Sequence, residues 1–228
     1  MNNTKNKWGS APFLVGEELR AAIVNASEAH PATLAIRMES DTDIYVDDFS
    51  DGRYINYHLV EPTSEWLKER LFWGSDCREY QSCWKDIVLD VLSKIDPNMF
   101  ICLNKICFVN SEADIQEMLK VVNAEEWELP DSLDMEDCSA VGMCWGSRSC
   151  VVVNLHAIEQ ANTELAQETA TVTDFWDEHA GILVTLLHSI RCLGLMNPMM
   201  RESNPNTEGL EDEAEHWARA VYEVLFGD

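Results

Sequence analysis

Two side chains that bind metals well, His188 and Cys192, lie four positions apart in the apolar stretch 186–195. On an α-helix this spacing places both side chains on one face, one turn apart. Imidazole nitrogen and thiolate sulfur are both good zinc ligands. Such a pair on a helix can therefore hold a zinc ion. The simpler alternative is a core histidine beside a buried thiol.

The same stretch keeps the frame of a zinc-protease helix without its catalytic residues. In the motif His-Glu-x-x-His, two histidines hold zinc and the glutamate is the general base for the bound water. Here Ser189 stands at the glutamate position and Cys192 at the second histidine position. A serine cannot take a proton from zinc-bound water as a carboxylate can. Glu178 lies about 15 Å away along a helix axis and cannot replace it. The sequence therefore predicts no peptidase activity.

A helix predicted at 208–226 supplies the third ligand. On a period of 3.6 residues, Glu211 falls closest to the apolar stripe of this helix among the local acids. Glu213 and Glu215 fall to either side of the stripe, and Asp212 faces away. We therefore expect Glu211 to point at the helix that carries His188. The stripe itself consists of Ala214, Trp217, Ala218, Val221 and Leu225.

The hydrophobic pattern predicts an α+β fold with a small mixed sheet. The motif helix, 174–195, is apolar nearly all round and is expected at the centre of the domain. The continuous apolar run at 149–155 predicts a strand that is buried on both faces. The last helix should pack across the motif helix through Trp217 and Val221. Residues 1–62 are expected to form an N-terminal α/β segment with an acidic loop, and 63–228 the core. Further helices are predicted at 16–29, 63–72, 82–95 and 111–122, strands at 33–38, 43–46 and 54–60, and a hairpin of 99–103 with 106–109.

This order of elements resembles a zincin group of predicted metallopeptidases from bacteria and their phages. In that group a Val-rich strand precedes a helix of the form Leu-Leu-His-Glu-Leu-Arg-His-x-Gly. A loop with Asn-Pro and a helix of the form Glu-x-x-Ala-Glu-x-Trp follow. The resemblance covers roughly 64–228 and implies a zincin-like fold in which His188, Cys192 and Glu211 are the remnant of a zinc site. The corresponding segments here are 151–155, 187–194, 197–198 and 211–217.

The chain is strongly acidic. Its 228 residues include 41 acidic and 16 basic side chains, which gives a formal net charge of −25, while 46% hydrophobic residues allow a packed core. Such a surface repels nucleic acid and anionic lipid and attracts basic proteins. Two acid-rich connectors, 39–51 and 125–137, are the expected contacts for a basic partner. The residues singled out are Asp41, Asp43, Asp47, Asp48, Glu125, Glu126, Trp127 and Glu128.

Trp127 lies among glutamates in the second connector. An aromatic side chain surrounded by carboxylates is a typical hot spot for a basic partner. The alternative is a tryptophan that folds back and pins the connector, because large aromatic side chains are seldom left exposed.

The cysteines and the N-terminus predict a cytoplasmic protein. None of the eight cysteines forms a C-x-x-C pair, and no apolar run follows Met1. We therefore expect free thiols, no secretory signal and no membrane-spanning segment. No resident cofactor is expected, with zinc the one candidate.

Three functions from different classes fit these observations. The first is a pseudoenzyme, a zincin-like domain without catalysis that acts by binding a partner protein. The second is an acidic inhibitor that imitates nucleic acid on a basic protein, a composition typical of phage inhibitors of bacterial defence nucleases. The third is a zinc-dependent hydrolase with an unusual His/Cys/Glu site.

Overall fold

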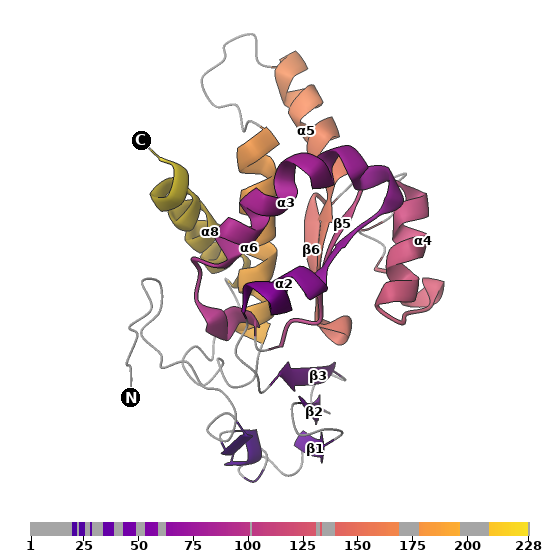
Figure 1. The fold of residues 1–228 in the computed structure, drawn as a ribbon, viewed down its shortest axis with the longest axis vertical. Coiled ribbons are helices and arrows are strands. Elements are labelled where there is room, and N and C mark those ends of the chain that lie inside the picture. Colours follow the sequence, from indigo (N-terminus) through magenta and orange to yellow (C-terminus); the bar gives the residue numbers. More distant parts are fainter. Residues whose placement is uncertain are drawn as a thin grey trace.

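The structure, a computed structural model, contains two β-sheets (Figure 1). The first is antiparallel, with strand order β1 (Leu34–Met38), β2 (Asp43–Asp48) and β3 (Arg53–His58). The second is built from later residues, so the expected boundary at residue 62 falls between the sheets. The structure describes residues 20–21, 23–25, 28, 34–38, 43–48, 53–58, 63–100, 102–130, 133, 140–168, 178–196 and 210–227.

The second sheet is mixed, as predicted. Its strand order is β4 (Leu71–Trp73), β5 (Lys105–Val109), β7 (Cys150–Asn154) and β6 (Gly142–Trp145). The first three strands run parallel, and β6 pairs with β7 antiparallel at one edge. All five residues of β7 are buried, which confirms the expectation of a strand covered on both faces.

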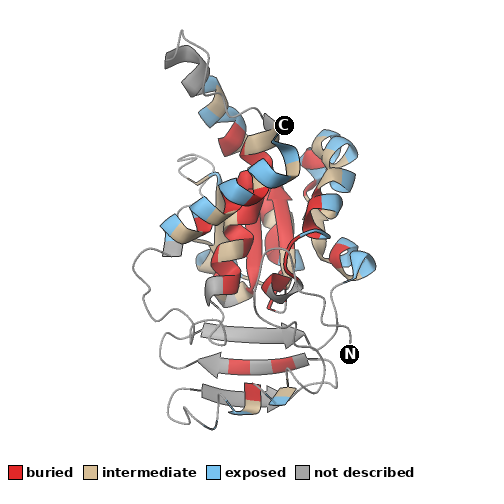
Figure 2. Ribbon diagram, turned by 90° about the vertical axis from the view of Figure 1, so that its left-hand side faces the viewer, coloured by how far each residue is buried: buried red, intermediate tan, exposed pale blue. Residues whose placement is uncertain are grey.

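Helices cover both faces of this sheet (Figure 1). Val151 and Val153 of β7 face a core shared with α3 (Arg78–Leu92), α6 (Glu178–Met196) and α8 (Leu210–Phe226). Val152 faces a second core formed with α4 (Glu112–Val121). This alternation follows from the two-residue period of a strand. Figure 2 shows the buried residues gathered in the central strands and in α6. Further described elements are the 14-residue helix α5 (Leu155–Glu168) and the shorter α2 (Ser64–Arg70), η1 (Ser75–Cys77), η2 (Pro97–Phe100), η3 (Glu126–Glu128) and η5 (Gly146–Arg148).

Helix α6 lies in the centre of the core. Residues 181–187 are buried without interruption, and the helix packs against β6, β7 and α8. Helix α8 contributes the buried Val221 and the partly buried Trp217 to this core. The predicted arrangement of the two helices is therefore confirmed. Among the described residues, no helix combines the length and the apolar character that crossing a membrane requires.

The hairpin predicted for 99–109 is wrong. Residues 97–100 form the short helix η2, and β5 pairs in parallel with β4 and β7. Met99, Phe100 and Leu103 are apolar because they belong to the main core, close to α6. A short apolar run of this kind does not distinguish a strand from a buried turn.

The first helix of the core is shorter than predicted. Thr63 caps α2, with its hydroxyl accepting the Trp66 N–H at 3.2 Å. The helix ends at Arg70, and the next three residues form β4 instead of its last turn. Ser111 caps α4 in the same way, since its hydroxyl accepts the Asp114 N–H at 3.2 Å.

The first acidic segment is largely a strand and not a connector. Asp43, Asp47 and Asp48 lie in β2, the central strand of the antiparallel sheet. The buried Ile44 and Val46 alternate with polar residues and give the segment the period of a strand. The strand predicted at 43–46 is therefore confirmed, and the expected acidic loop is wrong for residues 43–48. Asp41 lies outside the described residues.

A buried carboxylate joins the ends of β4 and β5. Asp114 is fully buried and accepts the backbone N–H groups of Asp76 and Asn110, each at 2.9 Å. The Cys77 thiol donates to the same carboxylate at 3.2 Å. Gly74 follows β4 at this point, and a Cβ there would lie 2.1 Å from Asp114 Cγ. The contact therefore requires glycine at position 74.

We expect Gly74→Ala to lower the free energy of unfolding by about 2–4 kcal/mol, because the new methyl group must displace the buried carboxylate. Gly194→Ala is the matched control. A Cβ at Gly194 of α6 meets its nearest neighbour at 3.7 Å, so this variant should be neutral or slightly stabilised. Chemical denaturation of both variants measures the difference. Equal stabilities would contradict the described packing of Gly74 on Asp114.

Candidate metal site

The structure brings together the three residues expected to form the site. His188 and Cys192 lie on α6, and Glu211 lies in the first turn of α8. The distance from His188 Nε2 to Glu211 Oε2 is 3.0 Å. Cys192 Sγ lies 3.6 Å from the same imidazole nitrogen and 3.9 Å from the same carboxylate oxygen. Three potential metal ligands from two helices therefore face one point.

Neighbouring contacts fix how α8 crosses α6. Ala214 packs directly on Cys192. Arg191 forms an ion pair with Glu213 and lies with its guanidinium carbon 5.6 Å from the centre of the Trp217 ring. These contacts flank Glu211 and hold it above the motif helix.

The distances fit one zinc ion. Zinc–ligand bonds of about 2.0–2.3 Å at tetrahedral angles place neighbouring ligand atoms about 3.4–3.6 Å apart. The observed separations of 3.0, 3.6 and 3.9 Å lie around that range. Imidazole, thiolate and carboxylate are all ligands that zinc accepts. The three residues could thus supply three of four ligands without a large movement of either helix.

The site is closed on one side and open on the other. Cys192 is buried, whereas the side chains of His188 and Glu211 are 29% and 79% exposed. Burial raises the pKa of the Cys192 thiol to about 12, and the negative charge of Glu211 adds to this effect. The thiol is therefore protonated at neutral pH when no metal is bound. A protonated thiol is a poor nucleophile, which argues against a catalytic Cys–His pair.

Ser189 points away from solvent. It is 2% exposed, and its hydroxyl has no hydrogen-bond partner among the described residues. The hydroxyl oxygen would lie 3.3 Å from a Cβ at Gly142 of β6. The residue at the position of the general base is therefore a small, buried side chain packed against the edge strand.

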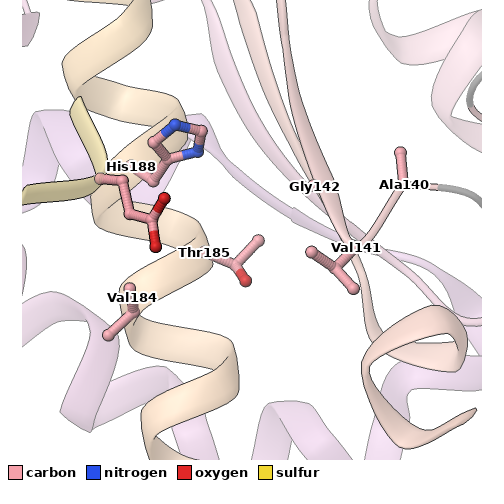
Figure 3. Close-up of a pocket in the computed structure, with 7 residues that line it drawn as sticks. Ala140, Val141, Gly142, Val184, Thr185 and His188 are labelled. Carbon is pink, nitrogen blue, oxygen red and sulfur yellow. The ribbon is translucent and has the colours of Figure 1, made fainter. Parts of the chain in front are cut away.

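A cavity of about 340 Å³ adjoins His188, between α6 and the start of β6. Figure 3 shows Thr185 and His188 on the helix facing Val141 on the strand side. Glu215 of α8 also lines the cavity. Arg219 donates to Glu215 at 2.7 Å, and this hydrogen bond lowers the pKa of the carboxyl group. His188 therefore belongs both to the metal-ligand cluster and to a cavity that contains a charged carboxylate.

The cavity could not be derived from the sequence. Helical spacing placed Glu215 beside the apolar stripe and gave no reason to prefer it. Strand β6 was not predicted, because Gly142–Trp145 is short and has no clear alternation. The signal that was available is the position of Glu215 one turn after Glu211, on the same side of α8.

The residues of the second acidic segment differ in how far they are available to a partner. Glu125, Glu126 and Trp127 lie in or next to η3, and Trp127 is 82% exposed. The alternative in which Trp127 folds back is therefore wrong. Glu128 forms an ion pair with Arg148, so its carboxylate stabilises the protein itself and is not available to a partner.

A scan against family models and searches of curated proteins and solved structures found no match for this chain. The interpretation of the site therefore rests on its own residues and distances.

We expect Ser189→Ala to be as stable as the wild type or more stable, because it removes a buried hydroxyl without a partner. Ser111→Ala provides the comparison. The Ser111 hydroxyl accepts the Asp114 N–H and donates to Asp76 at 2.7 Å, so its loss should cost about 1 kcal/mol. Urea denaturation measures both. A Ser189→Ala variant that loses as much as Ser111→Ala would disprove the described environment of Ser189.

Proposed function

We propose that this protein is a zincin-like pseudoenzyme. In this proposal it binds zinc through His188, Cys192 and Glu211, does not hydrolyse peptides and acts by binding a partner protein. The convergence of three zinc ligands beside a buried serine at the position of the general base carries the proposal. The sequence alone favoured no resident metal, whereas the distances between the ligand atoms favour zinc.

The role proposed for the metal is structural. His188 and Cys192 belong to α6 and Glu211 belongs to α8, so shared coordination would join the two helices at the start of α8. Bound zinc can also act as a Lewis acid and can acidify a water molecule. Ser189 cannot accept a proton from such a water molecule, because its side chain has no carboxylate and is buried.

A zinc-dependent hydrolase is the second candidate, and Glu215 is the observation that favours it. Among the described residues that line the cavity, Glu215 is the one carboxylate. Its lowered pKa keeps it ionised at neutral pH. A general base works best when its pKa lies near the operating pH, which makes a carboxylate of low pKa a weak base. The pseudoenzyme is therefore the better-supported function.

Zinc titration of the metal-free protein should give one tightly bound zinc per chain. Zinc affinity should fall by at least about 10–100-fold in each of three variants, His188→Ala, Cys192→Ala and Glu211→Gln. Substituting residues that only hydrogen-bond to metal ligands already lowers metal affinity by that factor. The matched controls are His216→Ala and Cys83→Ala, which change exposed residues of the same types. Competition with a chromophoric chelator measures the affinities. If none of the three single substitutions weakened zinc binding, the proposed site would be contradicted.

The zinc-loaded protein should not cleave a peptide library. If cleavage is seen, is abolished by a chelator and is lost in Glu215→Gln while zinc remains bound, the protein is a hydrolase that uses Glu215. Such a result would replace the pseudoenzyme proposal and retain the metal site.

Zinc affinity should rise with pH. The pKa of Cys192 is raised, so the free thiol keeps its proton throughout the neutral range and must release it when zinc binds. As pH rises this proton competes less, and affinity should increase by about tenfold per pH unit as long as the free thiol is protonated. Cys192→His lacks the thiol and should show little change over the same range. A wild-type affinity that does not vary with pH would exclude Cys192 as a ligand.

A further inference from the structure

Trp127 is far more exposed than the other large apolar side chains of the described residues. It is 82% exposed, and the next value is 52% at Val224 of α8. An indole in water forgoes the free energy that its burial would release. A partner that covers this side chain would therefore gain binding free energy from its burial.

The turn that carries Trp127 is held firmly at its start. Helix α4 ends with Asn123 in a left-handed conformation, φ 53°. The Ala124 N–H then donates to the Leu119 carbonyl at 2.9 Å, a bond typical of a helix C-terminus. Ala124 itself packs on the core between α4 and the sheet. The chain therefore enters η3 in one fixed direction.

The end of the turn is held equally well. The Glu128 carboxylate accepts the Glu125 N–H at 2.7 Å and also pairs with Arg148 of η5. Leu129 packs on the same core as Ala124. The exposure of Trp127 is thus a property of an ordered turn. An aromatic side chain on a rigid support loses little entropy on binding and is suited to be a hot spot.

The charges beside Trp127 select the partner. Glu125 and Glu126 are exposed, whereas the charge of Glu128 is balanced by Arg148. The basic side chain nearest to these glutamates along the chain is the exposed Lys120, in the last turn of α4. With a net charge of −25, the protein attracts cations and repels nucleic acid and anionic lipid.

We infer that Trp127, Glu125 and Glu126 form a docking site for an arginine-rich segment of a partner protein. A guanidinium group stacks on the indole face and its N–H groups pair with the adjacent carboxylates. Arginine suits this site better than lysine because its planar group can make both contacts at once. The inference rests on the proposed partner-binding role and is independent of zinc.

The experiment uses the full-length protein and a fluorescent peptide of alternating arginine and glycine, about twelve residues long, at about 0.15 M salt, where long-range attraction is screened. Fluorescence anisotropy gives the Kd. Trp127→Ala should raise it at least about tenfold, while Val224→Ala, the exposed apolar control, should leave it unchanged. Glu126→Gln should raise it about threefold, and Glu223→Gln, the exposed acidic control on α8, less than about twofold.

Nuclear magnetic resonance of the indole N–H groups gives a second readout. The signal that is missing in Trp127→Phe belongs to Trp127, and the arginine peptide should shift it. A peptide with glutamine in place of arginine should not. No binding of the arginine peptide would overturn the inference. It would also be overturned if Trp127→Ala matched Val224→Ala, or if Glu126→Gln matched Glu223→Gln, because diffuse charge attraction would then explain the affinity.

Cys192→Ala separates the two proposals. This variant should bind the arginine peptide as the wild type does, even though its zinc affinity falls. Loss of peptide binding in Cys192→Ala alone would contradict the independence of the docking site from the metal site. Conversely, Trp127→Ala should bind zinc as tightly as the wild type does.

Discussion

The burial of α6 is the constraint on which the rest of the structure depends. A helix that is apolar on nearly all sides must be covered by several elements at once, and here β6, β7 and α8 share that task. Small polar side chains such as Ser189 are buried with it, whereas its larger polar and metal-binding side chains gather near the crossing with α8. His188, Arg191 and Cys192 occupy that crossing, and Glu211 and Glu213 of α8 face them.

The same constraint explains the electrostatics of the site. Packing against Ala214 buries Cys192 and keeps its thiol protonated. His188 and Glu211 remain accessible to solvent, and their facing atoms lie 3.0 Å apart, within hydrogen-bond distance. The metal-free site is therefore held together by contacts that do not require an ion. A cation that displaces the thiol proton would meet ligands already in position, so little of its binding free energy would be spent on rearranging the helices.

The sequence predicted this site because helical geometry is regular. The four-residue spacing of His188 and Cys192 and the position of Glu211 beside an apolar stripe follow from the helical period alone. Short elements gave no comparable signal. Strands β4 and β6 span three and four residues, too few to show a periodic pattern, and the strand that pairs with β4 lies more than 30 residues away along the chain. The apolar residues at 99–103 suggested a strand, and that prediction was wrong. These residues are apolar because they are buried in the main core, and a buried segment need not be extended. The glutamates beside Trp127 were compatible with an exposed hot spot, but the sequence could not decide between this and a tryptophan that folds back, and the structure decides for exposure.

The zinc K-edge X-ray absorption spectrum of the zinc-loaded protein tests the central claim most directly, because it counts the ligand types around the metal. Coordination by Cys192, His188 and Glu211 predicts one sulfur at about 2.3 Å, together with nitrogen and oxygen ligands at about 2.0–2.2 Å and the imidazole scattering of one histidine. A spectrum with only oxygen ligands would show that zinc binds the acidic surface. A spectrum with two or more sulfurs would place zinc among other cysteines. Either result would contradict a metal site at the crossing of α6 and α8.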